Sequence, residues 1–137
     1  MNNFHLTIIT PEKTFFDDET TEVIVRTTEG DIGILANHIS LVAALPSGPM
    51  KMRKEDGTFR VAAISIGLIK VGGNRVNIFA DAIEWAEDID VDWAKRSEQE
   101  ARDRIAAQES EKEITFAELK LKRALNRLSV HESSYKK

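Results

Sequence analysis

The sequence predicts an α+β fold, in which an N-terminal antiparallel β-sandwich, or flattened barrel, precedes a C-terminal antiparallel hairpin of two helices. Short alternating or β-branched runs, separated by turn residues, fill the first half of the chain. Apolar residues take helical spacing from about residue 88 onward. Charged side chains occupy 20 of the first 87 positions and 22 of the last 50. We therefore expect two domains, residues 1–86 and 87–137, closely joined at residues 84–88.

Seven runs of the first domain are predicted to be strands: residues 4–10, 22–28, 39–45, 50–53, 59–65, 68–71 and 75–80. Several connections between them, at 46–49, 55–57 and 72–74, are short and rich in turn residues. Such connections predict hairpins rather than helical crossovers. The acidic pair Asp17 and Asp18 is assigned to a solvated turn.

A further, very short apolar strand is predicted between Gly30 and Gly33. Glycine reaches backbone angles that a side chain forbids, so two tight bends can lie three residues apart. Asn37 is predicted to take a left-handed turn position, which asparagine tolerates better than most residues. Taken alone, this run fits a purely structural hairpin as well as a binding surface.

The second domain is predicted to begin with a helix capped by Asp88, Asp90 or Asp92, because a carboxylate accepts hydrogen bonds from the free amides at a helix start. One row of this helix has mostly small residues that let another helix approach closely: Trp93, Ser97, Ala101 and Ile105. A second helix carries a stronger stripe, made by Ala117, Leu121, Ala124, Leu125 and Leu128. The polar residues 108–113 are predicted to connect them. Such a hairpin buries little core, so we expect it to need support from the sandwich, a partner or a ligand.

Composition excludes several classes of function. The chain has 137 residues, no cysteine and only three histidines, and their spacing suggests neither a metal site nor a catalytic pair. We therefore expect a protein that is not an enzyme. A net charge of -4 argues against a nucleic-acid binder. No signal-peptide pattern and no run of roughly 20 apolar residues is present, so we expect a soluble chain that meets a membrane only through a partner.

Three stretches resemble the epsilon subunit of bacterial F-type ATP synthases. They are residues 30–35 with His38, the last-helix residues 117–119 and 122–128, and residues 8–11, and they occur in the family's order over nearly the whole chain. The chain departs from the family at Ala36 and Asn37, where Pro and Gly are usual, and at residues 65–68, where Ser-Gly-Gly-Phe is common.

The resemblance implies a noncatalytic rotor subunit, held peripherally at the cytoplasmic face of the cell membrane as part of the synthase. Its implied partners are the gamma subunit, the c-ring, and the alpha and beta subunits of the catalytic head. The hairpin would act as a brake, permitting turnover when folded and opposing ATP hydrolysis when extended into the head. The alternative is a free-standing protein that senses nucleotide through its helical hairpin.

Two groups of contact residues follow. The resemblance assigns contact with the c-ring to Asp31 and His38, although the residues alone fit His38 as a turn residue equally well. The last helix carries Lys120, Lys122, Arg123 and Arg127, with no acidic residue between positions 119 and 130. This face is either simply solvated or meets an anion, and the resemblance offers an acidic segment of a beta subunit or the phosphates of ATP.

No cofactor is implied as required, and ATP is implied as a weak regulatory ligand. Six positions match the family's nucleotide-binding pattern: Glu84, Ile89, Asp90, Ala94, Arg123 and Arg127. Trp93 and Glu100 stand where nucleotide-binding members carry arginine. Losing one arginine removes a fork of donors suited to phosphate, and Glu100 adds repulsion toward a polyanion. We therefore expect weak ATP binding.

Overall fold

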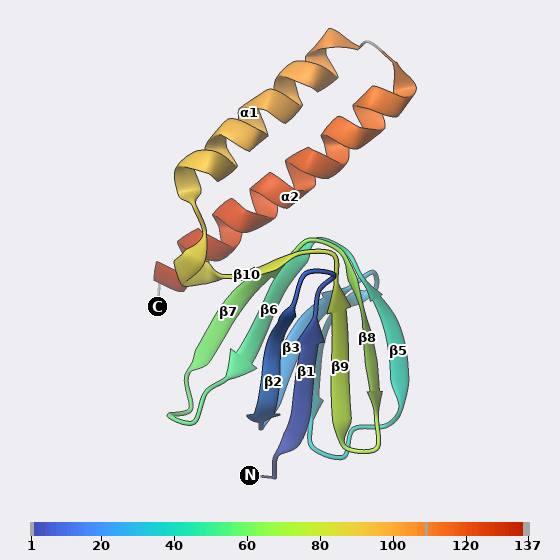
Figure 1. The fold of residues 1–137 in the computed structure, drawn as a ribbon, viewed down its shortest axis with the longest axis vertical. Helices are drawn as coiled ribbons and strands as arrows, with labels where there is room; N and C mark the ends of the chain where they lie inside the picture. Colours follow the sequence, from blue (N-terminus) through green and yellow to red (C-terminus); the bar gives the residue numbers. More distant parts are fainter. Residues whose placement is uncertain (1, 109, 136–137) are drawn as a thin grey trace. The chain divides into compact units, whose positions relative to one another are not determined.

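The computed structural model of this protein describes residues 2–108 and 110–135 (Figure 1). The chain divides into two compact units, one ending at Trp85 and the other beginning at Ala86. Each unit has its own secondary structure, strands in the first and helices in the second, so each is described separately.

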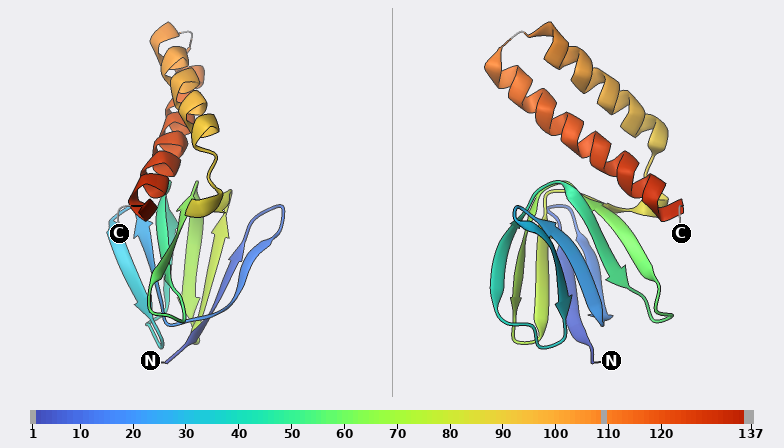
Figure 2. Two further views of the ribbon diagram at one scale, coloured as in Figure 1. Left: turned by 90° about the vertical axis from the view of Figure 1, so that its left-hand side faces the viewer. Right: turned by 180° about the vertical axis from the view of Figure 1, so that it is seen from behind.

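The described part of the first unit contains ten strands in two five-stranded sheets (Figures 1 and 2). One sheet has the order β2-β1-β9-β8-β5 and the other the order β10-β7-β6-β3-β4. The strands are β1 (Phe4–Ile9), β2 (Thr14–Thr20), β3 (Glu22–Thr27), β4 (Gly30–Leu35), β5 (Leu41–Leu45), β6 (Gly48–Arg53), β7 (Phe59–Ile64), β8 (Gly67–Gly72), β9 (Arg75–Ala80) and β10 (Ile83–Trp85). Their pairings are antiparallel apart from β1 with β9, which is parallel. The predicted sandwich is confirmed.

The core forms because alternate residues of each strand point to the same face. Phe4, Leu6 and Ile8 of β1 are fully buried, and Val76 and Ile78 of β9 continue the same layer. The ring of Trp85 packs against Phe15, with their centroids 4.8 Å apart, and the Arg60 guanidinium lies 3.7 Å from its centroid. Trp85 therefore completes the core of the first unit at the last residue of that unit.

Two turn predictions in this unit are wrong. Asp17 and Asp18 lie within β2, opposite Thr7 and Leu6 of β1. They point to opposite faces of the strand and both are exposed, which is possible because β2 is at the edge of its sheet. The predicted turn at 46–49 is also too long, since β6 begins at Gly48. Proline has no N–H, so it would cost a hydrogen bond in the part of β6 that pairs with β3. Pro49 lies just before that part and is therefore tolerated in the strand.

The second unit consists of a short 3-10 helix (Ala86–Asp88) followed by α1 (Val91–Ala107) and α2 (Glu111–Tyr135). Asp90 caps α1, as predicted, and its carboxylate accepts a hydrogen bond from the Trp93 amide at 3.0 Å. Helix α2 begins inside the predicted connection because the Ser110 hydroxyl accepts a hydrogen bond from the Glu113 amide at 3.1 Å. The Ser-x-x-Glu spacing was the sequence signal for this start.

The two helices lie side by side (Figures 1 and 2), and the buried residues between them are mostly small. Ser97 and Ala101 are buried as predicted, and so is Ala94, which the predicted row omits. On α2 the buried members of the predicted stripe are alanines, Ala117 and Ala124, while its leucines remain partly exposed. Short side chains let the helix backbones come close, at the cost of a thin apolar interface.

Substitution of Gly67 tests how closely two strands of the sandwich pack. A Cβ atom at this position would lie 2.5 Å from the Phe79 carbonyl oxygen and 3.3 Å from the Ala80 Cα, and both are backbone atoms that cannot rotate away. We expect Gly67→Ala to lower the free energy of unfolding by about 1–3 kcal/mol. Urea denaturation followed by circular dichroism measures it. Gly33→Ala is the control, since its Cβ meets nothing closer than 3.8 Å; equal losses in both variants would refute this account.

Candidate functional site

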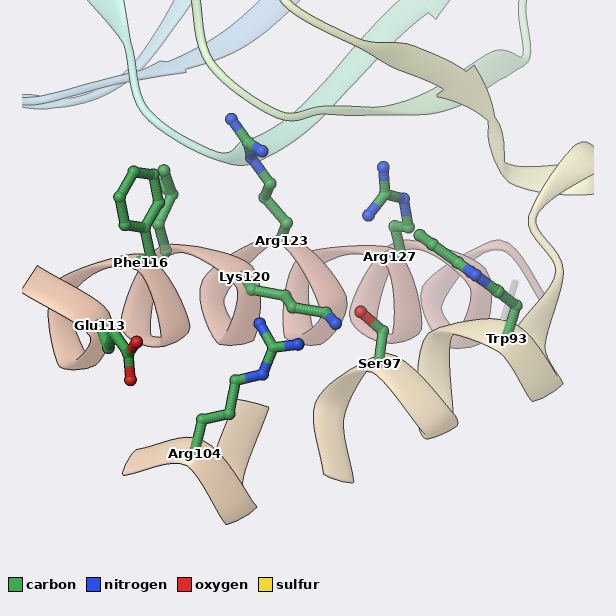
Figure 3. A pocket seen from close by; sticks show the side chains of 9 residues that line it. Trp93, Ser97, Arg104, Glu113, Phe116, Lys120, Arg123 and Arg127 are labelled. Carbon is green, nitrogen blue, oxygen red and sulfur yellow. The ribbon is translucent and has the colours of Figure 1, made fainter. Parts of the chain in front are cut away.

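A groove of about 900 Å³ runs between α1 and α2 (Figure 3). Its lining contains four basic side chains and one acidic side chain, so an anion would be favoured in it. The lining residues are Trp93, Ser97, Arg104, Glu113, Phe116, Leu119, Lys120, Arg123 and Arg127. All belong to the second unit.

Helical spacing places these side chains together. On α2, Phe116 and Lys120 are four residues apart, and Arg123 and Arg127 continue the same face at the next two turns. Arg104 of α1 was missed by the sequence reasoning, and so was Phe116. The signal for Phe116 was its four-residue spacing from Lys120.

Lys120 reaches across to α1 and makes an ion pair with Glu100, with Nζ and Oε2 2.6 Å apart. The hydrogen bond from Lys120, with its positive charge, lowers the pKa of the Glu100 carboxyl. The basic face of α2 therefore has an acidic neighbour after all. Spacing along α2 alone cannot predict this neighbour, because it belongs to the other helix.

Arg127 also meets α1. Its guanidinium carbon lies 5.1 Å from the centroid of the Trp93 ring, within the range of a cation–π contact, and Figure 3 shows the two side chains next to each other. Trp93 remains 47% exposed, so the contact is at the surface of the hairpin.

The other residues predicted for nucleotide binding have local structural roles. Asp90 is the cap of α1, and Ile89 and Ala94 are buried apolar residues. Glu84 belongs to β10 of the first unit. Of the six predicted positions, only Arg123 and Arg127 line the groove. Lys122, predicted to contact the catalytic head, is exposed and lies outside the groove lining.

The structure does not bring Asp31 and His38 together. Asp31 is the second residue of β4, and its carboxylate accepts a hydrogen bond from Arg26 at 2.9 Å, which lowers the pKa of Asp31. His38 follows the other end of β4, where its amide donates to the Leu35 carbonyl at 3.3 Å. From Asp31 to Leu35 the strand rises roughly 13 Å.

An exposed apolar surface adjoins the His38 end of β4. Ile39 is 80% exposed and Val42 62% exposed, and half of the Leu35 side chain is also open to solvent. Exposed apolar side chains this large, grouped within residues 35–42, are typical of a contact surface. The resemblance implied a contact at Asp31 and His38, and the exposed apolar residues near His38 were not among the predicted site residues.

A second apolar surface crosses the outer face of the β2-β1-β9-β8-β5 sheet. Leu68 of β8 lies opposite Phe79 of β9, which in turn lies opposite Ile9 of β1, and Ala44 of β5 extends the row from Leu68. We call these four residues the outer apolar band. Leu68 and Phe79 are each more than two-fifths exposed, although the alternation of their strands would suit polar residues there.

Other kinds of site receive no support from the structure. Within residues 2–108 and 110–135, no group of three or more His, Cys, Asp or Glu side chains is placed to hold a metal ion. None of the helices in those ranges combines the length and apolar character needed to cross a membrane.

Comparison with known proteins places both units. Residues 3–86 match the family described as ATP synthase, Delta/Epsilon chain, beta-sandwich domain, and residues 87–132 match its long alpha-helix domain. An ATP synthase epsilon chain from Ruminococcus albus is 44% identical over 128 residues, covering 93% of this chain and 95% of the relative. One from Alkaliphilus oremlandii is 47% identical over 110 residues, covering 80% and 81%. A chain of the Euglena gracilis mitochondrial ATP synthase, solved by cryo-electron microscopy, has the same fold, with a TM-score of 0.79, 24% identity and coverage of 90% and 78%.

Proposed function

This chain belongs to the ATP synthase delta/epsilon family, as one of the epsilon chains, which are noncatalytic subunits of the central stalk. We propose that its two domains have separate roles in the complex. The sandwich, residues 1–86, binds the gamma subunit and the c-ring. The hairpin, residues 87–137, regulates the complex by opposing ATP hydrolysis when it opens toward the alpha and beta subunits. The observation that carries this proposal is the presence of two exposed apolar surfaces on the sandwich and a basic groove in the hairpin.

The c-ring contact is assigned to the His38 end of β4. His38, Leu35, Ile39 and Val42 present one polar and three exposed apolar side chains in a short stretch of chain. Asp31 is left out of this surface because it lies at the other end of β4 and is already paired with Arg26. The outer apolar band is assigned to the gamma subunit, since apolar side chains on a sheet face bury well against a helical shaft.

The brake is assigned to Lys120, Lys122, Arg123 and Arg127 of α2. Opening of the hairpin releases Lys120 and Arg127 from α1, so that these cations can meet acidic side chains of the head. Oppositely charged surfaces guide and orient such a contact.

The brake predicts that Lys120→Ala, Arg123→Ala and Arg127→Ala together raise the rate of ATP hydrolysis by the assembled complex. Each exposed ionic contact contributes under about 1 kcal/mol, so single changes should be mild and the triple change several-fold. The triple change also removes the contacts of Lys120 and Arg127 with α1, so a faster rate cannot come from a more tightly closed hairpin. Hydrolysis by complexes reconstituted with each variant is the measurement.

A chain truncated after residue 86 provides the reference for this experiment. It should still copurify with the gamma subunit and the c-ring, and it sets the rate that complete loss of the brake can reach. If the complex with the triple variant hydrolyses ATP at the native rate, while the complex with the truncated chain is faster, the basic residues do not act in the brake. Failure of the truncated chain, still folded, to join gamma would contradict the division of work.

Besides acidic side chains of the catalytic head, ATP is a candidate to meet these basic residues, bound weakly in the groove. The basic lining, with Arg123 and Arg127 from the predicted set, supports this proposal. A free-standing nucleotide sensor would use the same groove but would not copurify with gamma and the c-ring, so copurification separates it from the stalk subunit.

A further inference from the structure

Two contacts join α1 to α2 across the groove, and they share one register. Glu100 lies seven residues after Trp93, and Arg127 lies seven residues after Lys120, so the pairs Trp93 with Arg127 and Glu100 with Lys120 are two helical turns apart. That spacing is about 10.5 Å along the hairpin. Both pairs therefore act on the same face of two antiparallel helices.

We propose that these two pairs form a clasp that keeps the hairpin closed when no nucleotide is bound. The proposal concerns the isolated chain, so it does not depend on the partners assigned above. The seam between the helices offers little else, because the buried residues of α1 and α2 in the described ranges are alanines and a serine apart from Val130, and each buried methyl group contributes little. Contacts at the rim of the seam then decide how often the hairpin opens.

The clasp also uses two of the four basic side chains that line the groove. An anion entering the groove must compete with Glu100 for Lys120 and must share Arg127 with the Trp93 ring. The charged groups acting on Glu100 are Lys120, Arg104 and Arg96, and together with the Lys120 hydrogen bond they lower the pKa of Glu100. A carboxyl with a lowered pKa stabilises the closed state at neutral pH and loses that effect only in acid, below its ordinary value of 4.5.

The test uses the full chain without partners. The sequence contains no cysteine, so Lys95→Cys on α1 and Ser129→Cys on α2, both exposed, provide a unique pair for spin labels. Without nucleotide the labels should report one closed hairpin, unchanged by Mg-ATP below millimolar concentration. In Trp93→Ala with Glu100→Gln, the ratio of open to closed hairpins should rise about three- to thirty-fold. Hydrogen exchange of the α1 amides measures the same ratio when the open state is rare.

Glu98→Gln is the matched control. It removes an ion pair with Arg102, 2.9 Å long, that lies within α1 and does not cross to α2, so opening should not change. Exchanging the charges, with Glu100→Lys and Lys120→Glu, should restore closure lost in Glu100→Gln. The proposal is overturned if the clasp variant opens no more than Glu98→Gln, or if the native hairpin is open until Mg-ATP is added.

Discussion

Replacing Leu68 and Phe79 by glutamate should strongly weaken binding of this chain to the gamma subunit. The two side chains face each other across β8 and β9 and form the centre of the outer apolar band. Both are exposed, at 41% and 44%, so the sandwich loses little packing when they change. An interface that covers them would lose about 1.5–3 kcal/mol per apolar side chain and would have to bury two unpaired carboxylates. The expected loss of affinity is therefore more than about 100-fold.

Binding of the purified double variant to gamma, by biolayer interferometry, tests this prediction. Lys51→Glu is the control, because it adds negative charge at an exposed position of β6, in the other sheet. Circular dichroism checks that each variant is folded. A folded double variant that binds gamma as tightly as the native chain would exclude the outer apolar band from the interface.

The sandwich was predictable because its strands are specified locally. Alternating apolar residues and turns such as 72–74 determine strand and hairpin without reference to the rest of the chain. Strand β2 was missed because its identity depends on its neighbour: Asp17 and Asp18 are acceptable in a strand only at the edge of a sheet. The start of β6 depends in the same way on a neighbour, because Gly48 and Pro49 pair with Ile64 and Ala63 of β7.

The basic face of α2 could be predicted from spacing, but its partners on α1 could not. Which residue of α1 faces Lys120 is set by the length of the connection between the helices, and that connection is shorter than predicted. A shift by one residue would turn Glu100 about 100° around the helix and away from Lys120. Asp31 and His38 are seven positions apart. On a helix that spacing would place both side chains on one face, but Asp31 belongs to strand β4 and His38 follows its far end, so the two side chains lie apart.

We expect Trp93→Arg with Glu100→Arg to bind ATP at least tenfold more tightly than the native chain. The two changes replace one neutral and one repulsive side chain with cations: Trp93 lines the groove with Arg123 and Arg127, and Glu100 pairs with Lys120 of the same lining. A charge-assisted hydrogen bond to phosphate contributes roughly 1.5–3 kcal/mol. The changes also remove the ring under Arg127 and the carboxylate that holds Lys120, so both cations become available to the ligand.

Loss of the clasp offsets part of this gain. If only the closed hairpin binds ATP, the apparent affinity equals the affinity of the closed state multiplied by the fraction of hairpins that are closed. Isothermal titration of ATP into the isolated chains gives the net effect. Trp93→Arg with Glu98→Arg is the control. It has the same change in charge, but Glu98 pairs with Arg102 within α1, whereas Glu100 pairs with Lys120 of the groove lining. In Trp93→Arg with Glu100→Arg, the spin labels should show a hairpin that closes when ATP is added, because a ligand that binds only the closed state stabilises it. Tight binding by the native chain, or an equal gain in the control, would mean that Trp93 and Glu100 do not set the affinity.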